Sequence, residues 1–179
     1  MLISVVLVER TVPGFNGLLD AIGRTFSAQL TTAMIDFPLT RSFRASRKQF
    51  DAEVLLRELR RLAGSGDEGL TIFIIREDIF AGRLSFVFGL ASKNACVLST
   101  ARLDPRFYGA VPDIPAAGAL FKERIVKEAV HELGHCMGLP HCDDKKCVMV
   151  FSDSIVGVDR KGKEFCNGCQ KVIKRITGK

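Results

Sequence analysis

Residues 131–141 read HELGHCMGLPH, and they contain all three histidines of the chain. His131 and His135 are four residues apart in a segment with helical spacing, so their imidazoles share one helix face and can bind one metal ion. Gly138 can adopt the left-handed conformation that ends a helix and reverses the chain. The stretch therefore predicts an active-site helix that ends before Gly138 and a return segment that supplies His141 as a third ligand.

Three protein ligands leave one coordination position for water, which is typical of a catalytic rather than a structural zinc site. Glu132 follows the first ligand, where its carboxylate can reach a water on the metal without binding the metal itself. Zinc acidifies such a water and polarises a carbonyl oxygen, and Glu132 can transfer the proton to the leaving amine. The pattern predicts a zinc metallopeptidase, a hydrolase, with Glu132 as general base. The alternative is that the three histidines are buried in the core and bind no metal. That interpretation is better for a lone histidine than for three histidines with this spacing.

Four cysteines follow the last histidine in two pairs, the second of which is a C-x-x-C: Cys142, Cys147, Cys166 and Cys169. Two such pairs match a closed tetrahedral zinc site with four thiolate ligands. A redox-active C-x-x-C, disulfides and an iron–sulfur cluster on the same thiolates are the alternatives. The other two cysteines, Cys96 and Cys136, are predicted to pack in the interior.

Apolar runs and helical spacing alternate along the first half of the chain. Strands are predicted at residues 2–8, 31–37 and 70–75, with a hairpin of 86–91 and 95–100 across 92–94. Helices are predicted at residues 15–30, 49–63, from near Leu120 into the histidine motif, and 170–176, with a Pro- and Gly-containing loop at 104–118. This order predicts an α/β fold whose mixed sheet is mostly parallel with one antiparallel edge strand.

The length and composition suit a single catalytic domain, residues 1–179. We expect an N-terminal part, 1–138, that includes the active-site helix, and a small zinc-stabilised C-terminal part, 139–179. No apolar run approaches the roughly 20 residues of a membrane span, and the apolar start lacks a basic leader and a cleavage site. We therefore expect a cytoplasmic protein with no membrane contact.

The formal net charge of +6 raises nucleic-acid binding as an alternative function. Residues 41–48 combine one Phe with four basic side chains, and Lys171, Lys174 and Arg175 lie near the C-terminus. Basic stretches of this kind are more often solvated surface, so this alternative is disfavoured.

The run HELGHCMGLPHC, followed by Cys147-Val148-Met149 and Cys166-x-x-Cys169, closely resembles the archaemetzincins, zinc peptidases of the metzincin clan. The resemblance implies a zincin-like form of this α/β (α+β) fold, with a twisted sheet and helices behind it. It also implies two zinc ions per chain, one catalytic on the three histidines and one structural on the four cysteines. It also implies that Met149 forms a hydrophobic base under the catalytic zinc. Finally, it implies that an edge strand within residues 86–91 binds an extended peptide by backbone pairing.

The substrate class beyond a peptide or protein stays open at this point. An aminopeptidase needs a carboxylate for the free amine, for which Asp104, Asp113 and Glu123 are candidates, whereas an endopeptidase needs an open cleft. Tyr108 could line that cleft. A low-turnover peptide-binding zinc protein is a further alternative, although the retained Glu132 favours an enzyme.

Overall fold

Five strands form the main sheet of the computed structural model, which describes residues 1–8, 11–63, 69–109 and 114–178. Their order across the sheet is β2-β1-β5-β8-β7. Their bounds are β1 Leu2–Val8, β2 Gln29–Ile35, β5 Leu70–Ile75, β7 Gly89–Ser92 and β8 Ala95–Ser99. The strands β2, β1, β5 and β8 run parallel, and β7 pairs antiparallel with β8 at one edge. This confirms the predicted mixed sheet with its antiparallel edge strand.

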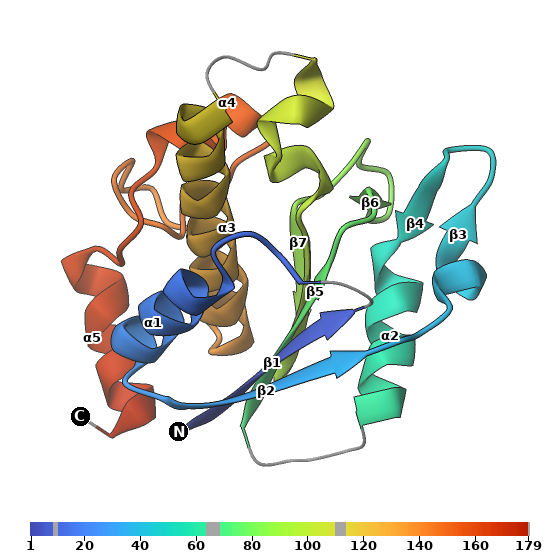
Figure 1. Ribbon diagram of the computed structural model, residues 1–179. Helices are drawn as coiled ribbons and strands as arrows, with labels where there is room; N and C mark the ends of the chain where they lie inside the picture. Colours follow the sequence, from blue (N-terminus) through green and yellow to red (C-terminus); the bar gives the residue numbers. More distant parts are fainter. Residues whose placement is uncertain (9–10, 64–68, 110–113, 179) are drawn as a thin grey trace.

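The central strands are buried on both faces, which explains their continuous apolar sequences. In β1 the side chains of Ile3, Val5 and Leu7 enter one hydrophobic cluster, whereas Val6 and Val8 enter a second cluster on the other face. The first cluster contains residues of α1 (Phe15–Phe26) and α3 (Ile114–Cys136), and the second contains residues of α2 (Ala52–Ala63). Helices α1 and α3 thus cover one face of the sheet and α2 covers the other (Figure 1).

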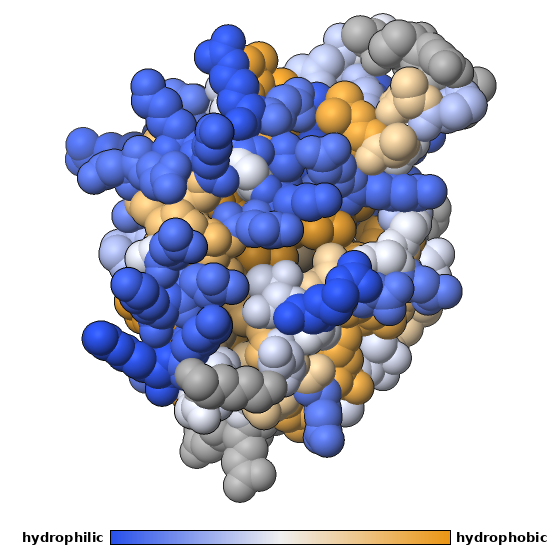
Figure 2. All heavy atoms as spheres, turned by 90° about the vertical axis from the view of Figure 1, so that its left-hand side faces the viewer, coloured by the Kyte–Doolittle hydropathy of each residue, from blue (hydrophilic) through white to orange (hydrophobic). Residues whose placement is uncertain are grey.

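Shorter elements complete the described fold. A small sheet of order β3-β4-β6 comprises β3 (Phe43–Arg44), β4 (Gln49–Asp51) and β6 (Ile79–Phe80). Three 3-10 helices are η1 (Leu39–Ser42), η2 (Ala101–Leu103) and η3 (Pro105–Tyr108), and the C-terminal part contains α4 (Ile155–Arg160) and α5 (Asn167–Thr177). On the face that carries α1 and α5, hydrophilic residues predominate and hydrophobic residues form only smaller patches (Figure 2).

All four predicted helices have other bounds in the structure, and the last one, predicted at 170–176, is α5 from Asn167 to Thr177. The segment 49–63 begins with strand β4, and α2 starts only at Ala52, because Asp51 Oδ1 accepts hydrogen bonds from the amides of Glu53 and Val54. Helix α3 begins at Ile114 rather than near Leu120, since Pro115 stands in the first turn, where its missing N–H costs nothing. The first helix ends at Phe26, before β2.

The edge hairpin is shorter than predicted. Its outer strand begins at Gly89 instead of residue 86, and Ser92 pairs with Ala95, so the turn consists of Lys93 and Asn94. Lys93 adopts φ 53°, the left-handed conformation that two-residue hairpin turns require. No helix among the described residues is long and apolar enough to span a membrane.

Candidate metal centre

The end of α3 and the turn after it bring the three histidines together. Gly138 adopts φ 83°, and its amide donates to the carbonyl of His135 at 2.9 Å. The amide of Leu139 donates to Gly134 at 3.0 Å, so the chain folds back on the helix end. His141 consequently lies beside the two histidines of α3, and the three rings form one group of possible ligands.

The distances within this group fit a zinc ion. Nε2 of His135 lies 3.1 Å from Nε2 of His131 and 3.3 Å from Nε2 of His141. Two ligand nitrogens of a tetrahedral zinc site, at about 2.0–2.1 Å from the metal, are about 3.3 Å apart. Nδ1 of His131 lies 2.9 Å from the carbonyl of Val148, and Nδ1 of His135 lies 2.7 Å from the carbonyl of Leu139. These carbonyls fix the tautomer in which Nδ1–H donates, so the Nε2 lone pairs converge on one point.

A buried ion pair lies directly behind the first histidine. The ammonium of Lys161 is 2.8 Å from Oε1 of Glu128 and 3.3 Å from Nδ1 of His131. Burial, and then the charge of Lys161, lower the pKa of His131 to about 2. Burial also lowers the pKa of His141. Both imidazoles are therefore held in the neutral form that binds metal.

Glu132 is buried between α3 and the edge strand, with 6% of its surface exposed. A Cβ atom at Gly89 would lie 2.6 Å from Cγ, Cδ and Oε1 of Glu132, so only a glycine allows β7 to cross this carboxylate so closely. Burial, and then the charge of Glu128, raise the pKa of Glu132 well above its usual range. Sequence reasoning missed Gly89, although a glycine within an apolar strand is a signal for a close backbone approach.

Met149 lies below the histidine helix. The side chain is fully buried, and a Cβ at Gly134 would lie 2.5 Å from its Sδ. The carbonyl of Met149 accepts a hydrogen bond from the amide of Cys142 at 3.0 Å. The segment of Val148 and Met149 thus contacts both the histidine helix and the first residue of the cysteine group.

The four cysteines after the histidines also form one group. Sγ of Cys142 is 3.8 Å from Sγ of Cys166, which excludes a disulfide and matches the spacing of about 3.8 Å between thiolates on one zinc ion. The amide of Cys166 donates to Sγ of Cys147 at 3.3 Å. A backbone hydrogen bond from Cys169 lowers the pKa of Cys166 to about 7, whereas burial raises the pKa of its neighbour Cys169, so without a metal the first negative charge of the group forms on Cys166. The residues therefore fit the predicted zinc ion.

The other two cysteines lie away from this group. Cys96 in β8 is fully buried, and Cys136 at the end of α3 is half-buried, in keeping with a packing role. Burial raises the pKa of the Cys96 thiol, and the neighbouring Cys136 adds to the rise.

The outer edge of β7 is available for backbone pairing. The amide of Ser99 donates to the carbonyl of Phe88 at 2.8 Å, so the residues of β7 alternate between pairing with β8 and facing outward. The backbone N–H and C=O groups of Gly89 and Ala91 point away from β8, and within the described ranges β7 is the last strand of the sheet. An extended peptide could add there as a further strand, directly above Glu132.

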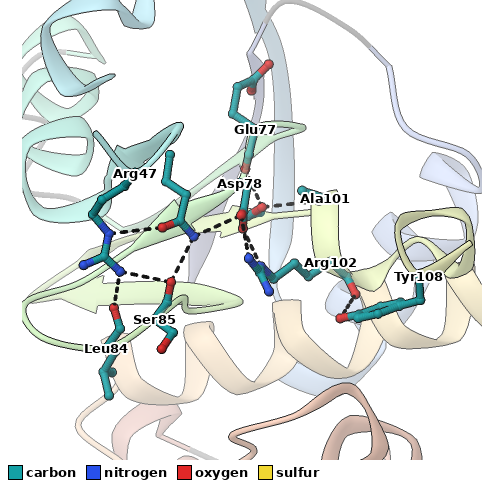
Figure 3. Close-up of polar contacts among 10 residues, drawn as sticks. Arg47, Glu77, Asp78, Leu84, Ser85, Ala101, Arg102 and Tyr108 are labelled. Carbon is teal, nitrogen blue, oxygen red and sulfur yellow. Dashed lines mark hydrogen bonds and ion pairs between the residues drawn. The ribbon is translucent and has the colours of Figure 1, made fainter. Parts of the chain in front are cut away.

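A polar network holds the segment that leads into β7 (Figure 3). Arg47 Nη2 donates to the carbonyls of Leu84 and Ser85 at 2.8 and 3.1 Å. Gln49 Nε2 donates to the same Ser85 carbonyl at 2.9 Å and to Asp78 Oδ2 at 3.0 Å. Arg102 closes the network through two contacts of 2.6 and 2.8 Å with Asp78. These residues fix the approach of the edge strand.

This network also uses part of the basic stretch 41–48. Arg47 stacks on the ring of Phe80 at 4.1 Å, and Arg44 pairs with Asp51 at 3.2 Å. Two of the four positive side chains in residues 41–48 therefore make contacts within the fold. This weakens the alternative that the stretch binds nucleic acid.

The other candidate residues make local contacts. Asp104 accepts from the amide of Arg106 and pairs with its guanidinium, and Glu123 pairs with Lys127 at 2.9 Å. The hydroxyl of Tyr108 donates to the carbonyl of Arg102 at 3.0 Å. Asp113 lies outside the described residues. Neither Asp104 nor Glu123 belongs to the histidine group of the described chain.

Comparisons with known proteins agree on one family. A sequence model of Peptidase family M54 matches residues 33–175. The archaemetzincin of Methanocaldococcus jannaschii is 38% identical over 85% of this chain and 80% of its own length. The archaemetzincin of Sulfolobus acidocaldarius is 41% identical over 71% of this chain and 70% of its own length. The crystal structure of archaemetzincin from Methanopyrus kandleri has a TM-score of 0.83 at 32% identity and covers 100% of this chain and 96% of its own. The crystal structure of archaemetzincin from Archaeoglobus fulgidus, complexed with malonate, has a TM-score of 0.79 at 33% identity. It covers 96% of this chain and 99% of its own.

Proposed function

The chain belongs to Peptidase family M54, the archaemetzincins, and is a zinc metallopeptidase; on this premise we propose how its own residues perform the hydrolysis. His131, His135 and His141 would hold the catalytic zinc ion through Nε2, with the carbonyls of Val148 and Leu139 orienting two of the rings. The observation that carries the proposal is the convergence of the three Nε2 atoms beside a buried carboxylate under a free sheet edge.

Zinc in this position supplies Lewis acidity, which polarises a peptide carbonyl and acidifies a water. Glu132 would accept the proton of the attacking water and pass it to the leaving amine. Its burial supports this role, because a carboxylate away from bulk water gains basicity. Gly89 lets the edge strand pass directly over Glu132, so a peptide paired with β7 lies next to the proton acceptor.

The peptide substrate would bind in extended form along the outer edge of β7. The outward N–H and C=O groups of Gly89 and Ala91 offer it main-chain hydrogen bonds, which do not depend on the substrate's sequence. The network of Arg47, Gln49 and Asp78 supports this role, because it orders the backbone that enters the strand.

A second zinc ion would have a structural role in the C-terminal part, residues 139–179. Its ligands would be Cys142, Cys147, Cys166 and Cys169, which would leave no position for water. The metal would join α5 to the segment that carries His141 and Met149. The hydrogen bond between the Cys142 amide and the Met149 carbonyl supports this coupling, because it links the two centres by backbone.

The variant Glu132→Gln tests the mechanism, since it keeps the shape of the side chain and removes its basicity. We expect normal zinc content, normal peptide binding and a fall in kcat of about 10²–10⁴-fold. Retention of full peptidase activity would contradict the general-base role. Aminoacyl amides compared with N-blocked peptides then separate an aminopeptidase from an endopeptidase, because only the former needs the free amine.

A further inference from the structure

A cavity of about 470 Å³ lies on the far side of the edge strand from Glu132. It is formed between α2 and β7, and its lining includes Glu53, Arg57 and Arg60 from the helix and Leu90 and Ser92 from the strand. The proposed reaction uses the other face of β7, where Gly89 meets Glu132. The cavity therefore belongs to the same sheet edge but has no part in the metal centre.

Side chains along β7 alternate between the two faces of the sheet, and this decides which residue of a bound peptide would point toward the cavity. Ala91 packs with the cluster on the α3 side, whereas Leu90 packs with the cluster on the α2 side. Residues opposite one another in a sheet point to the same face. In a peptide paired with β7, the residue opposite Gly89 would face Glu132, and the residue opposite Leu90 would turn its side chain toward the cavity.

The charges of the cavity select the side chain that it can take. The charged residues of its lining are two arginines, Arg57 and Arg60, and one glutamate, Glu53, which gives the lining an excess of positive charge. Arg60 is held in place, because it donates to the carbonyl of Ser92 and to Oδ1 of Asn94, both at 3.1 Å. Arg57 is exposed on the same side of the helix. A guanidinium pairs with a carboxylate in bidentate geometry more strongly than with any neutral group.

We propose that this cavity is a specificity subsite for an acidic side chain of the peptide substrate, at the position next to the residue that faces Glu132. Glutamate would fit better than aspartate, because Leu56 and Leu90 also line the cavity and offer apolar contacts to its longer stem. This inference rests on the proposed edge-strand binding of peptides. It adds a sequence preference to a mode that by itself recognises only the backbone.

Hydrolysis of N-blocked peptides with Glu, Gln or Lys at each position in turn tests the subsite. We expect the zinc-loaded protein to prefer Glu over Lys by about tenfold or more in kcat/KM at a single position, as one charge-assisted contact predicts. Arg57→Gln should remove most of this preference, and Arg57→Glu should reverse it. Arg24→Glu is the matched control, because Arg24 is equally an exposed helix arginine but lies on α1, across the sheet.

The outcomes separate this inference from the proposed function. Hydrolysis without a preference at any position, or an equal effect of Arg57→Glu and Arg24→Glu, would overturn the subsite and leave the peptidase mechanism standing. Binding of Glu peptides in preference to Lys peptides, lost in Arg57→Gln but without any cleavage, would support the subsite and count against the mechanism. Fluorescence anisotropy of the labelled peptides measures this binding directly.

Discussion

Replacement of Gly89 by alanine should disable catalysis without disturbing the metal ligands. The residue lies in β7 without a left-handed φ, so the alanine backbone is allowed there and only the new methyl group matters. That methyl would lie 2.6 Å from Glu132 atoms, whereas carbon atoms in contact prefer about 3.5–4.0 Å. Glu132 or β7 must therefore move by about 1 Å. A displacement of this size at a reacting group costs about 10²-fold in rate, or about 2.7 kcal/mol of barrier.

The assay for Gly89→Ala is kcat on an N-blocked peptide, measured together with zinc content and thermal unfolding. We expect kcat to fall about 10²-fold at unchanged zinc content. Gly118→Ala is the control, because Gly118 lies in the same active-site helix and a Cβ there meets nothing within 4 Å. It should keep full activity. If Gly89→Ala also keeps full activity, the close passage of β7 over Glu132 plays no part in catalysis.

Three further predictions concern the support of the metal centre. Lys161→Met should lower the free energy of unfolding by about 3–5 kcal/mol in urea denaturation, because it leaves the carboxylate of Glu128 buried without its partner. Adding Glu128→Gln to the same chain should recover much of this loss. If stability does not recover, the ion pair does not contribute as described. Cys166→Ser should reduce zinc from two ions to one per chain in native mass spectrometry, and an unchanged count would remove this cysteine from the ligand set. Gly134→Ala should destabilise the fold by about 1–3 kcal/mol through overpacking against Met149, and an unchanged melting temperature would refute this contact.

The sequence predicted those parts of the fold whose determinants are local. Strands β1 and β5 have the predicted bounds, because each is an apolar run buried on both faces and bounded by polar or turn residues. The start of α2 was predicted too early, because helical spacing cannot show that Gln49–Asp51 forms a strand, β4, between β3 and β6. The start of α3 was predicted too late, since a proline looks like a loop signal although the first turn tolerates it.

In the candidate site too, sequence predicted the groupings that depend on neighbouring residues and missed the contacts between distant ones. The histidines could be grouped from sequence because all three fall within residues 131–141 and one glycine turn joins them. The contacts of Gly89 with Glu132 and of Lys161 with His131 could not be predicted from sequence, because tertiary packing brings these distant parts of the chain together. The arginines of residues 41–48 illustrate the converse. The basic run was interpreted mainly as solvated surface, with nucleic-acid binding as a disfavoured alternative, but Arg47 donates hydrogen bonds to the carbonyls of Leu84 and Ser85 before β7.

The most direct test of the central claim is a zinc titration of chelator-stripped protein, with peptide hydrolysis and native mass spectrometry recorded at each step. The account predicts no hydrolysis without metal, activity that rises in proportion to occupancy of the histidine centre, and no activity in His141→Ala even when the four-cysteine centre is full. Substantial hydrolysis by the metal-free protein, or by His141→Ala with zinc bound only to the cysteines, would contradict it.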